Sequence, residues 1–205
     1  MDKTEYVKGI KREMNSFDNW VYEFLNSFNS EALTIIMVII TNLAHAITFI
    51  GITVLILIFV KNKIIKKYVV VNLIAVVAIN QALKYIIGRP RPEVTRLVSA
   101  HGYSFPSGHS MTVFAYYGFL IYLIYKHVKN IKVKIGLIIL LVCIILFVGV
   151  SRIYLGVHYA TDVIGGFLIS AVLVTGAILL YNKEEKTKIG KDKVKNKKME
   201  IEEQK

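Results

Sequence analysis

Long apolar runs constrain the fold of this chain more than any other feature of its sequence. Hydrophobic residues make up 55% of the 205 residues, and the mean hydropathy of +0.53 is too high for an ordinary water-soluble domain. A helix rising about 1.5 Å per residue over each run would cross most of a hydrocarbon core about 30 Å thick. We therefore expect an all-α, polytopic membrane bundle of about five transmembrane helices, over residues 44–60, 68–87, 108–125, 135–150 and 161–181.

The first 31 residues follow a different pattern. Apolar side chains recur there every three or four positions, at Val7, Ile10, Met14, Phe17, Val21, Phe24 and Phe28. This spacing predicts an amphipathic helix, or two short ones, on the membrane surface. The next apolar stretch is longer than one crossing needs, so we expect a short superficial helix up to about Thr41 before the first span. The chain thus divides into an amphipathic surface segment, a membrane-embedded domain and a charged tail, at residues 1–31, 32–181 and 182–205.

The formal charge of +12 is concentrated in lysine clusters that flank the apolar runs. The clusters occupy residues 61–67, residues 126–134 and the tail. With five spans all three lie on one side, and the positive-inside rule places that side in the cytoplasm. The connections at residues 88–107 and 151–160 then face the outside. This clustering favours a topological role over nucleic-acid binding, and we expect a solvated, partly disordered tail.

The outer connection after the fourth run carries an arginine, a histidine and an aspartate. If the segment from His158 onward is helical, Asp162 lies on the same face as His158 and can hold one ring nitrogen. The other nitrogen is then free to act as a nucleophile. A turn near Gly156 would bring in Arg152, whose guanidinium suggests an anionic, phosphorylated substrate. Taken alone, such a pair is more often a buried hydrogen-bonded pair than a catalyst.

Basic residues gather where the second run ends. Lys84 lies about one turn inside the expected helix end. Gly88 and Pro90 should end the helix, so that Arg89 and Arg91 fold back over the helix end. Basic side chains at the end of a span also commonly extend to lipid headgroups. Headgroup contact alone could therefore explain these residues, without a bound substrate.

A short motif, Pro106-Ser107-Gly108-His109, stands directly before the third run. Ser107 suits the N-cap of a helix, and Gly108 lets the backbone approach a ligand closely. The free amides and the positive helix end there would form an anion site. A capping serine by itself requires no ligand.

In this order and spacing the three groups resemble the signature of the type 2 phosphatidic acid phosphatase (PAP2) superfamily. The resemblance covers roughly residues 30–181. Bacterial members of similar length act on phosphatidylglycerophosphate or undecaprenyl diphosphate. The resemblance implies a metal-independent hydrolase that removes phosphate from such a lipid or from phosphatidic acid, in the cytoplasmic membrane with its site on the extracytoplasmic side.

The resemblance also implies a role for each motif residue. His158 would attack phosphorus and form a phosphohistidine, Asp162 would orient its ring, and His109 would protonate the leaving oxygen. Positive charge and amide donors would surround the phosphoryl oxygens, from Lys84, Arg91, Ser107, Gly108 and Arg152. No cofactor is implied.

Other readings of the same residues stay open. Intramembrane histidine and aspartate also mark transporters and proton pathways, although here they cluster at one membrane face. An inert interaction protein would be expected to have lost one of these groups. The expected partners are the lipid substrate and membrane lipids, and the single Cys143 allows no intrachain disulfide. Three residues of the long outer loop could select the lipid headgroup, or could be solvated loop residues without that role: Arg96, His101 and Tyr103.

Overall fold

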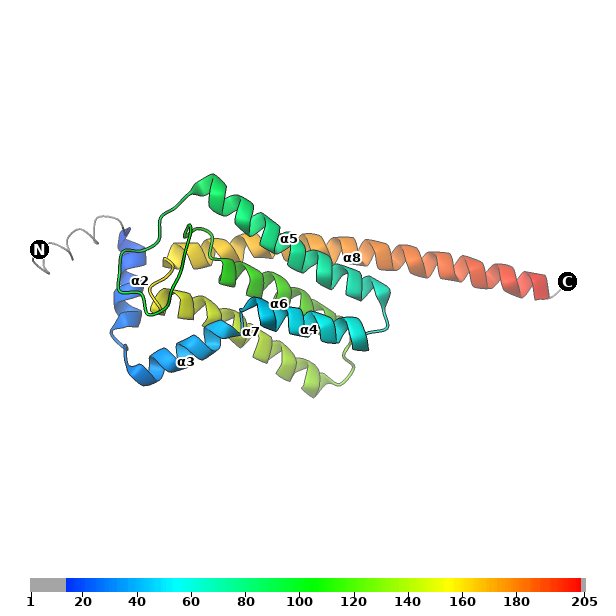
Figure 1. Cartoon of the computed structure of the whole chain (residues 1–205). Helices are drawn as coiled ribbons and strands as arrows, with labels where there is room; N and C mark the ends of the chain where they lie inside the picture. The colour runs from blue at the N-terminus through cyan, green and yellow to red at the C-terminus, as the bar shows by residue number, and fades with distance from the viewer. Residues whose placement is uncertain (1–13, 204–205) are drawn as a thin grey trace, which may run out of the picture.

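The structure, a computed structural model, describes residues 14–203, in which all regular secondary structure is helical. The helices that follow residue 45 run side by side as a bundle, the helix that begins at Ser16 lies across one of its ends, and the helix that begins at Glu31 packs beside the bundle toward that end (Figure 1). The helices are α2 (Ser16–Asn26), α3 (Glu31–Asn42), α4 (Ala46–Phe59), α5 (Lys63–Ile87), α6 (Gly108–His127), α7 (Ile131–Tyr154) and α8 (Ala160–Glu203). The predicted all-α membrane bundle is confirmed. The part of the predicted surface helix that contains Val7 and Ile10 lies outside the described residues.

Each of the five predicted spans coincides with a helix, α4 to α8, but the helices are not equally suited to lipid. By length and composition α5, α7 and α8 can each cross a membrane, and α2 with α3 qualifies only as a pair bent by 119°. Helix α4 is apolar but only 14 residues long. Helix α6 buries many of its side chains against α5, α7 and α8. A helix enclosed by other helices needs little lipid-facing apolar surface. Among the described residues, three of the five predicted spans therefore qualify as crossings by length and composition.

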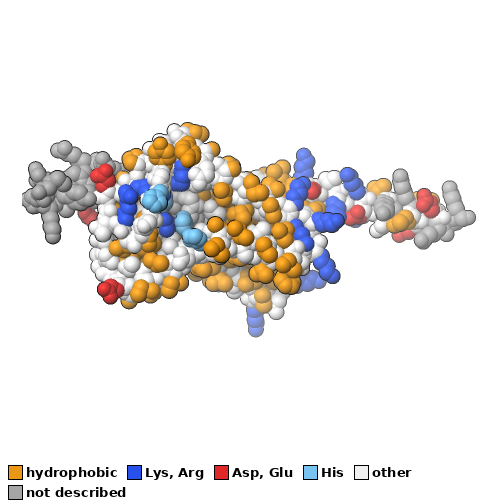
Figure 2. Space-filling model, viewed as in Figure 1, with side chains coloured by type: hydrophobic (Ala, Val, Ile, Leu, Met, Phe, Trp, Pro, Cys, Tyr) orange, Lys and Arg blue, Asp and Glu red, His pale blue; other side chains and the backbone are white. Residues whose placement is uncertain are grey.

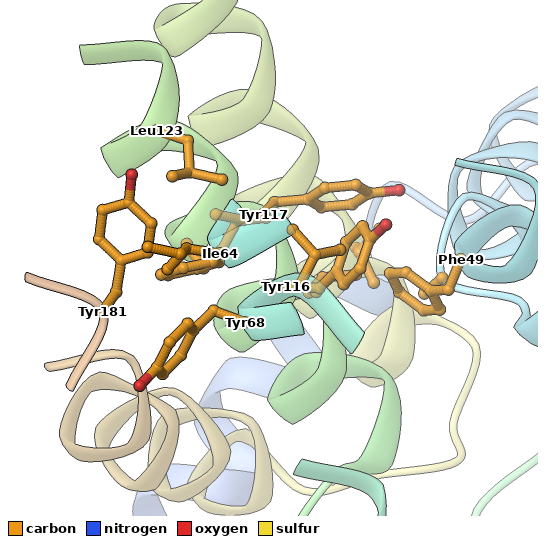
Figure 3. Close-up of a cluster of buried hydrophobic side chains, with 13 residues drawn as sticks. Phe49, Ile64, Tyr68, Tyr116, Tyr117, Leu123 and Tyr181 are labelled. Carbon is orange, nitrogen blue, oxygen red and sulfur yellow. The ribbon is translucent and has the colours of Figure 1, made fainter. Parts of the chain in front are cut away.

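Aromatic side chains fasten α4 to α6 in the core of the bundle. The ring of Phe49 meets that of Tyr116 edge-on, with centroids 5.2 Å apart (Figure 3). The hydroxyl groups of Tyr116 and its neighbour Tyr117 on α6 are both satisfied: that of Tyr116 lies 2.8 Å from the Thr53 hydroxyl, and that of Tyr117 donates to the Leu43 carbonyl at 2.9 Å. Buried polar groups cost little when they are paired in this way, so α6 is fixed relative to the start of α4.

The lysine clusters lie at the end of the bundle from which α8 extends. Figure 2 shows basic side chains at this end and at the opposite end, with hydrophobic side chains predominating between them. Lys67 of α5 pairs with Glu184 of α8 at 2.6 Å, and Lys126 of α6 pairs with Glu185.

The tail differs from its prediction. The sequence predicted a span ending at Tyr181 and a partly disordered tail, whereas α8 continues without a break to Glu203. Lysine and glutamate are good helix formers, and the ion pairs at Glu184 and Glu185 tie the first turn beyond the span to α5 and α6.

Helix α2 lies across the other end of the bundle (Figure 1). Its aromatic side chains point outward, with Trp20 64% and Phe24 53% exposed. This agrees with the predicted surface helix, because such a face suits the boundary between lipid and water. Its Asp18, by contrast, is fully buried against the bundle.

Candidate active site

A cavity of ≈ 390 Å³ opens at the end of the bundle that α2 covers. All three sequence groups contribute to its lining, with Lys84, Arg91, Gly108, His109, Arg152 and His158. Of the other predicted site residues, Asp162 lies directly behind His158, and Ser107 does not line the cavity. Folding therefore brings together residues that are up to 74 positions apart in the sequence, from Lys84 to His158.

His158 stands between α7 and α8, with its ring held by Asp162. The ring Nδ1 lies 3.3 Å from the Asp162 carboxylate, and Nε2 lies 3.3 Å from the Arg91 guanidinium on the cavity side. Burial lowers the pKa of His158 to about 4, although the bond to Asp162 opposes this shift. The imidazole is therefore neutral at pH 7. With its proton on Nδ1 toward Asp162, the Nε2 lone pair faces the cavity.

The local backbone differs from the predicted helix at His158. Helix α8 begins only at Ala160, and Asp162 accepts the Tyr159 amide at 3.0 Å, as a third-position acid does in a capping box. The same carboxylate thus starts the helix and holds the imidazole. The predicted pairing of His158 with Asp162 forms although His158 precedes the helix.

The predicted turn at Gly156 is confirmed. Gly156 has a φ of +70°, and the amides of Val157 and His158 both donate to the Arg152 carbonyl, at 3.2 and 3.3 Å. A Cβ at position 156 would meet the Thr95 carbonyl oxygen at 2.5 Å, so the turn requires glycine. This turn places Arg152 and His158 on the same cavity.

Arg152 is only 5% exposed and is not fully satisfied. One of its terminal nitrogens donates to the Thr41 hydroxyl at 2.8 Å, whereas its Nε has no partner among the described residues. A buried donor without a partner costs about 1–3 kcal/mol. An unpaired guanidinium nitrogen beside a cavity is a feature expected of an anion-binding group.

Arg91 and Lys84 are anchored through backbone carbonyls. Arg91 donates to the carbonyls of Val157 at 2.7 Å, His101 at 2.9 Å and Gly102 at 3.0 Å. Burial lowers the pKa of the Arg91 guanidinium from its ordinary value. Lys84 donates to the Tyr103 carbonyl at 2.7 Å. These bonds fix the two cations at the cavity wall before any substrate arrives, which reduces the reorganisation that binding would need.

Ser107 acts as the predicted N-cap of α6. Its hydroxyl is fully buried and accepts the Ser110 amide at 3.4 Å and the Ser110 hydroxyl at 2.9 Å. Gly108 and His109 follow it and do line the cavity. A Cβ at Gly108 would approach the Asn80 amide oxygen to 3.1 Å, so a larger residue would crowd this wall.

Two groups that hold Asp162 were not singled out as site residues from the sequence. The Ser104 hydroxyl donates to the same carboxylate oxygen that faces His158, and Arg89 donates to the other oxygen at 2.7 Å. Arg89 had a sequence signal, its place in the Arg89-Pro90-Arg91-Pro92 run, but headgroup contact explained it equally well. Ser104 had none, since an isolated loop serine is common.

A second, apolar groove adjoins the cavity. Its volume is ≈ 450 Å³, and α4, α5 and α6 line it with side chains such as Phe49, Ile50 and Leu73. The groove and the cavity share a wall formed by Asn80, Gln81, Gly108 and His109. Within residues 14–203, no group of three or more His, Cys, Asp or Glu side chains is arranged to hold a metal ion.

Comparison with known proteins places this arrangement in a family. The family described as the PAP2 superfamily matches residues 65–186. Phosphatidylglycerophosphatase B of Bacillus subtilis is 43% identical over 96 residues, which are 46% of this chain and 47% of that protein. The match thus spans about half the length of that relative. Undecaprenyl-diphosphatase of Sulfolobus acidocaldarius is 27% identical over 173 residues, covering 81% of this chain and 80% of that protein.

Solved structures agree in fold. A transmembrane PAP2-type phosphatidylglycerolphosphate phosphatase from Bacillus subtilis superimposes with a TM-score of 0.75 and 30% identity, over 81% of this chain and 85% of the other. LpxE of Aquifex aeolicus, at 22% identity, shares the fold with a TM-score of 0.67, over 81% and 97% of the two chains. The family match covers more than half of this multi-pass membrane protein, which therefore belongs to the PAP2 superfamily of phosphatases.

Proposed function

We propose that this protein hydrolyses a phosphate monoester or diphosphate of a membrane lipid through a phosphohistidine on His158. The observation that carries the proposal is the position of that imidazole. Its Nε2 faces a cavity that contains Lys84, Arg91 and Arg152, while Asp162 holds its Nδ1. A neutral, oriented imidazole beside three fixed cations suits nucleophilic attack on a phosphoryl group.

In the first step the Nε2 lone pair attacks phosphorus in line. The bond between phosphorus and the leaving oxygen breaks, and His109 gives that oxygen a proton. With a monoester the leaving group is a lipid alcohol, and with a diphosphate it is a lipid monophosphate. Asp162 stabilises the positive charge that the ring of His158 acquires.

In the second step water attacks the phosphohistidine. His109, now unprotonated, accepts a proton from the water, and the bond from phosphorus to Nε2 breaks to release inorganic phosphate. Lys84, Arg91, Arg152 and the amide of Gly108 stabilise the charge on the phosphoryl oxygens in both steps. The Ser107 hydroxyl contributes indirectly, by capping the helix that presents Gly108 and His109. Three fixed cations supply the positive charge for which other phosphatases use metal ions.

Two observations support a lipid substrate on the extracytoplasmic side. The apolar groove beside His109 offers a place for a hydrocarbon chain while the phosphate lies in the cavity. The lysine clusters lie at the opposite end of the bundle, and the positive-inside rule assigns them to the cytoplasm. The names of the relatives favour phosphatidylglycerophosphate and undecaprenyl diphosphate as substrates, with phosphatidic acid as a third candidate.

The test is phosphate release by the purified protein in detergent. We expect hydrolysis of at least one of the three lipids and far slower hydrolysis of a soluble sugar phosphate. Chelators should leave the rate unchanged, and orthovanadate should inhibit, because it mimics the five-coordinate phosphoryl group. His158→Ala should abolish turnover, and His127→Ala, at the other end of the bundle, should not. Absence of hydrolysis with all three lipids, or full activity of His158→Ala, would refute the proposal.

A further inference from the structure

Helix α2 buries an acid where a membrane-surface helix would normally expose one. Its aromatic residues face outward, whereas Asp18 is 0% exposed and faces the bundle. A buried carboxylate is costly unless charged and hydrogen-bonding partners surround it. The partners of Asp18 therefore show what this helix is fixed against.

Asp18 binds the first turn of α8. One of its carboxylate oxygens accepts the Thr161 amide at 2.8 Å, and the other accepts the Thr161 hydroxyl at 2.8 Å. The second oxygen also accepts the Asn15 side-chain amide at 2.8 Å. Thr161 immediately precedes Asp162, so an acid from the other end of the sequence stabilises the helix start that carries the proposed catalytic aspartate.

Arg89 links the two carboxylates. One terminal nitrogen donates to Asp162 at 2.7 Å, and the other donates to Asp18 at 3.0 Å. The guanidinium also stacks on the Tyr159 ring, 3.9 Å from its centroid. A planar guanidinium held at both ends has little rotational freedom. Arg89 therefore binds one carboxylate oxygen of Asp162, and the other oxygen of the same carboxylate faces His158.

We infer that Asp18 is a positioning residue for the reaction. It fixes Arg89 and the start of α8, and through them holds the Asp162 carboxylate at the angle that orients His158. Asp18 lies outside residues 65–186, which the family match covers, and does not line the cavity. This inference rests on the proposed function, and it predicts an effect on catalysis with no effect on substrate binding.

Asp18→Asn is the decisive change. Asparagine keeps one oxygen for the Thr161 amide but loses the charge and the second acceptor that hold Arg89. We expect kcat to fall by about tenfold, at the lower end of the roughly 10–100-fold losses that follow when the outer hydrogen-bond partners of metal-binding residues are changed. KM should be unchanged, because Asp18 makes no contact with the cavity. Glu31→Gln, the same chemical change at an exposed acid of α3, should leave both constants unchanged.

A double-mutant cycle separates positioning from simple loss of structure. If Asp18 acts through Arg89, adding Asp18→Asn to Arg89→Gln should lower kcat less than it does in the wild type. If Asp18→Asn does not fold in detergent, Arg89→Lys provides the test, since it keeps the charge but cannot bridge two carboxylates, and it should also lower kcat alone.

The outcomes are distinct. Wild-type kcat in Asp18→Asn, a loss confined to KM, or strictly additive losses in the cycle would overturn the positioning role and leave the proposed function standing. A wild-type protein that hydrolyses none of the lipid phosphates would overturn both.

Discussion

The two ends of the bundle both join helices through ion pairs, but the pairs differ in burial. At the lysine-rich end Lys67 and Glu184 have side chains 55% and 37% exposed. At the cavity end the carboxylates of Asp18 and Asp162 are fully buried around Arg89. Exposed pairs are screened by water and salt and contribute little. Breaking a buried pair leaves an uncompensated buried charge and is costly. We therefore interpret the exposed pair as a fastening between helices, and the buried pairs as part of the proposed reaction machinery.

The largest expected effect comes from the buried carboxylate behind His158. Asp162→Asn keeps the shape of the side chain but removes the charge that fixes the Nδ1 proton, so we expect kcat to fall by about 10⁴-fold, as happens when the equivalent acid of a catalytic triad is changed to its amide. Phosphate release under saturating substrate measures this. A loss below tenfold would show that the pairing of Asp162 with His158 is structural, like the ion pairs of the acids at the lysine-rich end.

A smaller loss is expected at Arg152, whose Nε has no partner within the described part of the chain. Arg152→Lys keeps a positive charge but removes the guanidinium fork, and loss of one donor to a developing anion typically lowers kcat by about 10²–10³-fold. Lys129→Arg, the converse exchange at an exposed position of the lysine-rich end, is the control. Equal losses in the two variants would contradict a specific role for Arg152.

The pH dependence should reveal the buried histidine. Burial holds the pKa of His158 near 4, so the ring is unprotonated above that pH and protonated below it. The rate should therefore not depend on His158 ionisation between pH 5 and 7, and should fall about tenfold per unit below pH 4. An exposed histidine would lose activity already near pH 6.5. Initial rates of kcat/KM against pH, with activity regained on return to neutral pH, distinguish the two.

The smallest effect is expected at the lysine-rich end. Glu184→Gln removes an ion pair that is partly exposed, so kcat should be unchanged and thermal stability should shift only slightly, by an amount that added salt reduces. Activity and thermal unfolding of the same preparation measure both. A clear loss of kcat would show that the ion pairs at the lysine-rich end are coupled to the reaction at the cavity end.

The sequence predicted the cavity end in part, because its motifs are local. The pairing of His158 with Asp162 needs four residues of chain, and the turn at Gly156 needs a glycine. All backbone groups of a spanning segment must be satisfied internally, so helices follow from apolar runs alone. These rules account for the helical bundle. Six of the fourteen residues that line the cavity were predicted site residues: Lys84, Arg91, Gly108, His109, Arg152 and His158.

The rest depends on contacts between distant segments. Asp18 lies 71 residues from Arg89 and 143 from Thr161, and in the sequence it looks like any acid on the polar face of a surface helix. Thr41 reaches Arg152 across 111 residues. Ser104 and Ser107 illustrate the same limit, since sequence indicates where a hydroxyl stands but not whether it faces a cavity or the protein interior.

The proposed mechanism requires a phosphoryl group bonded to His158 during turnover. Wild-type protein is mixed with a lipid that carries a labelled terminal phosphate, and the reaction is quenched within milliseconds. The quench is alkaline because phosphohistidine survives base. Mass spectrometry then locates the labelled residue. We predict label on His158 that appears before free phosphate and is absent from His158→Ala. Label on another side chain, or none while phosphate release continues, would contradict it.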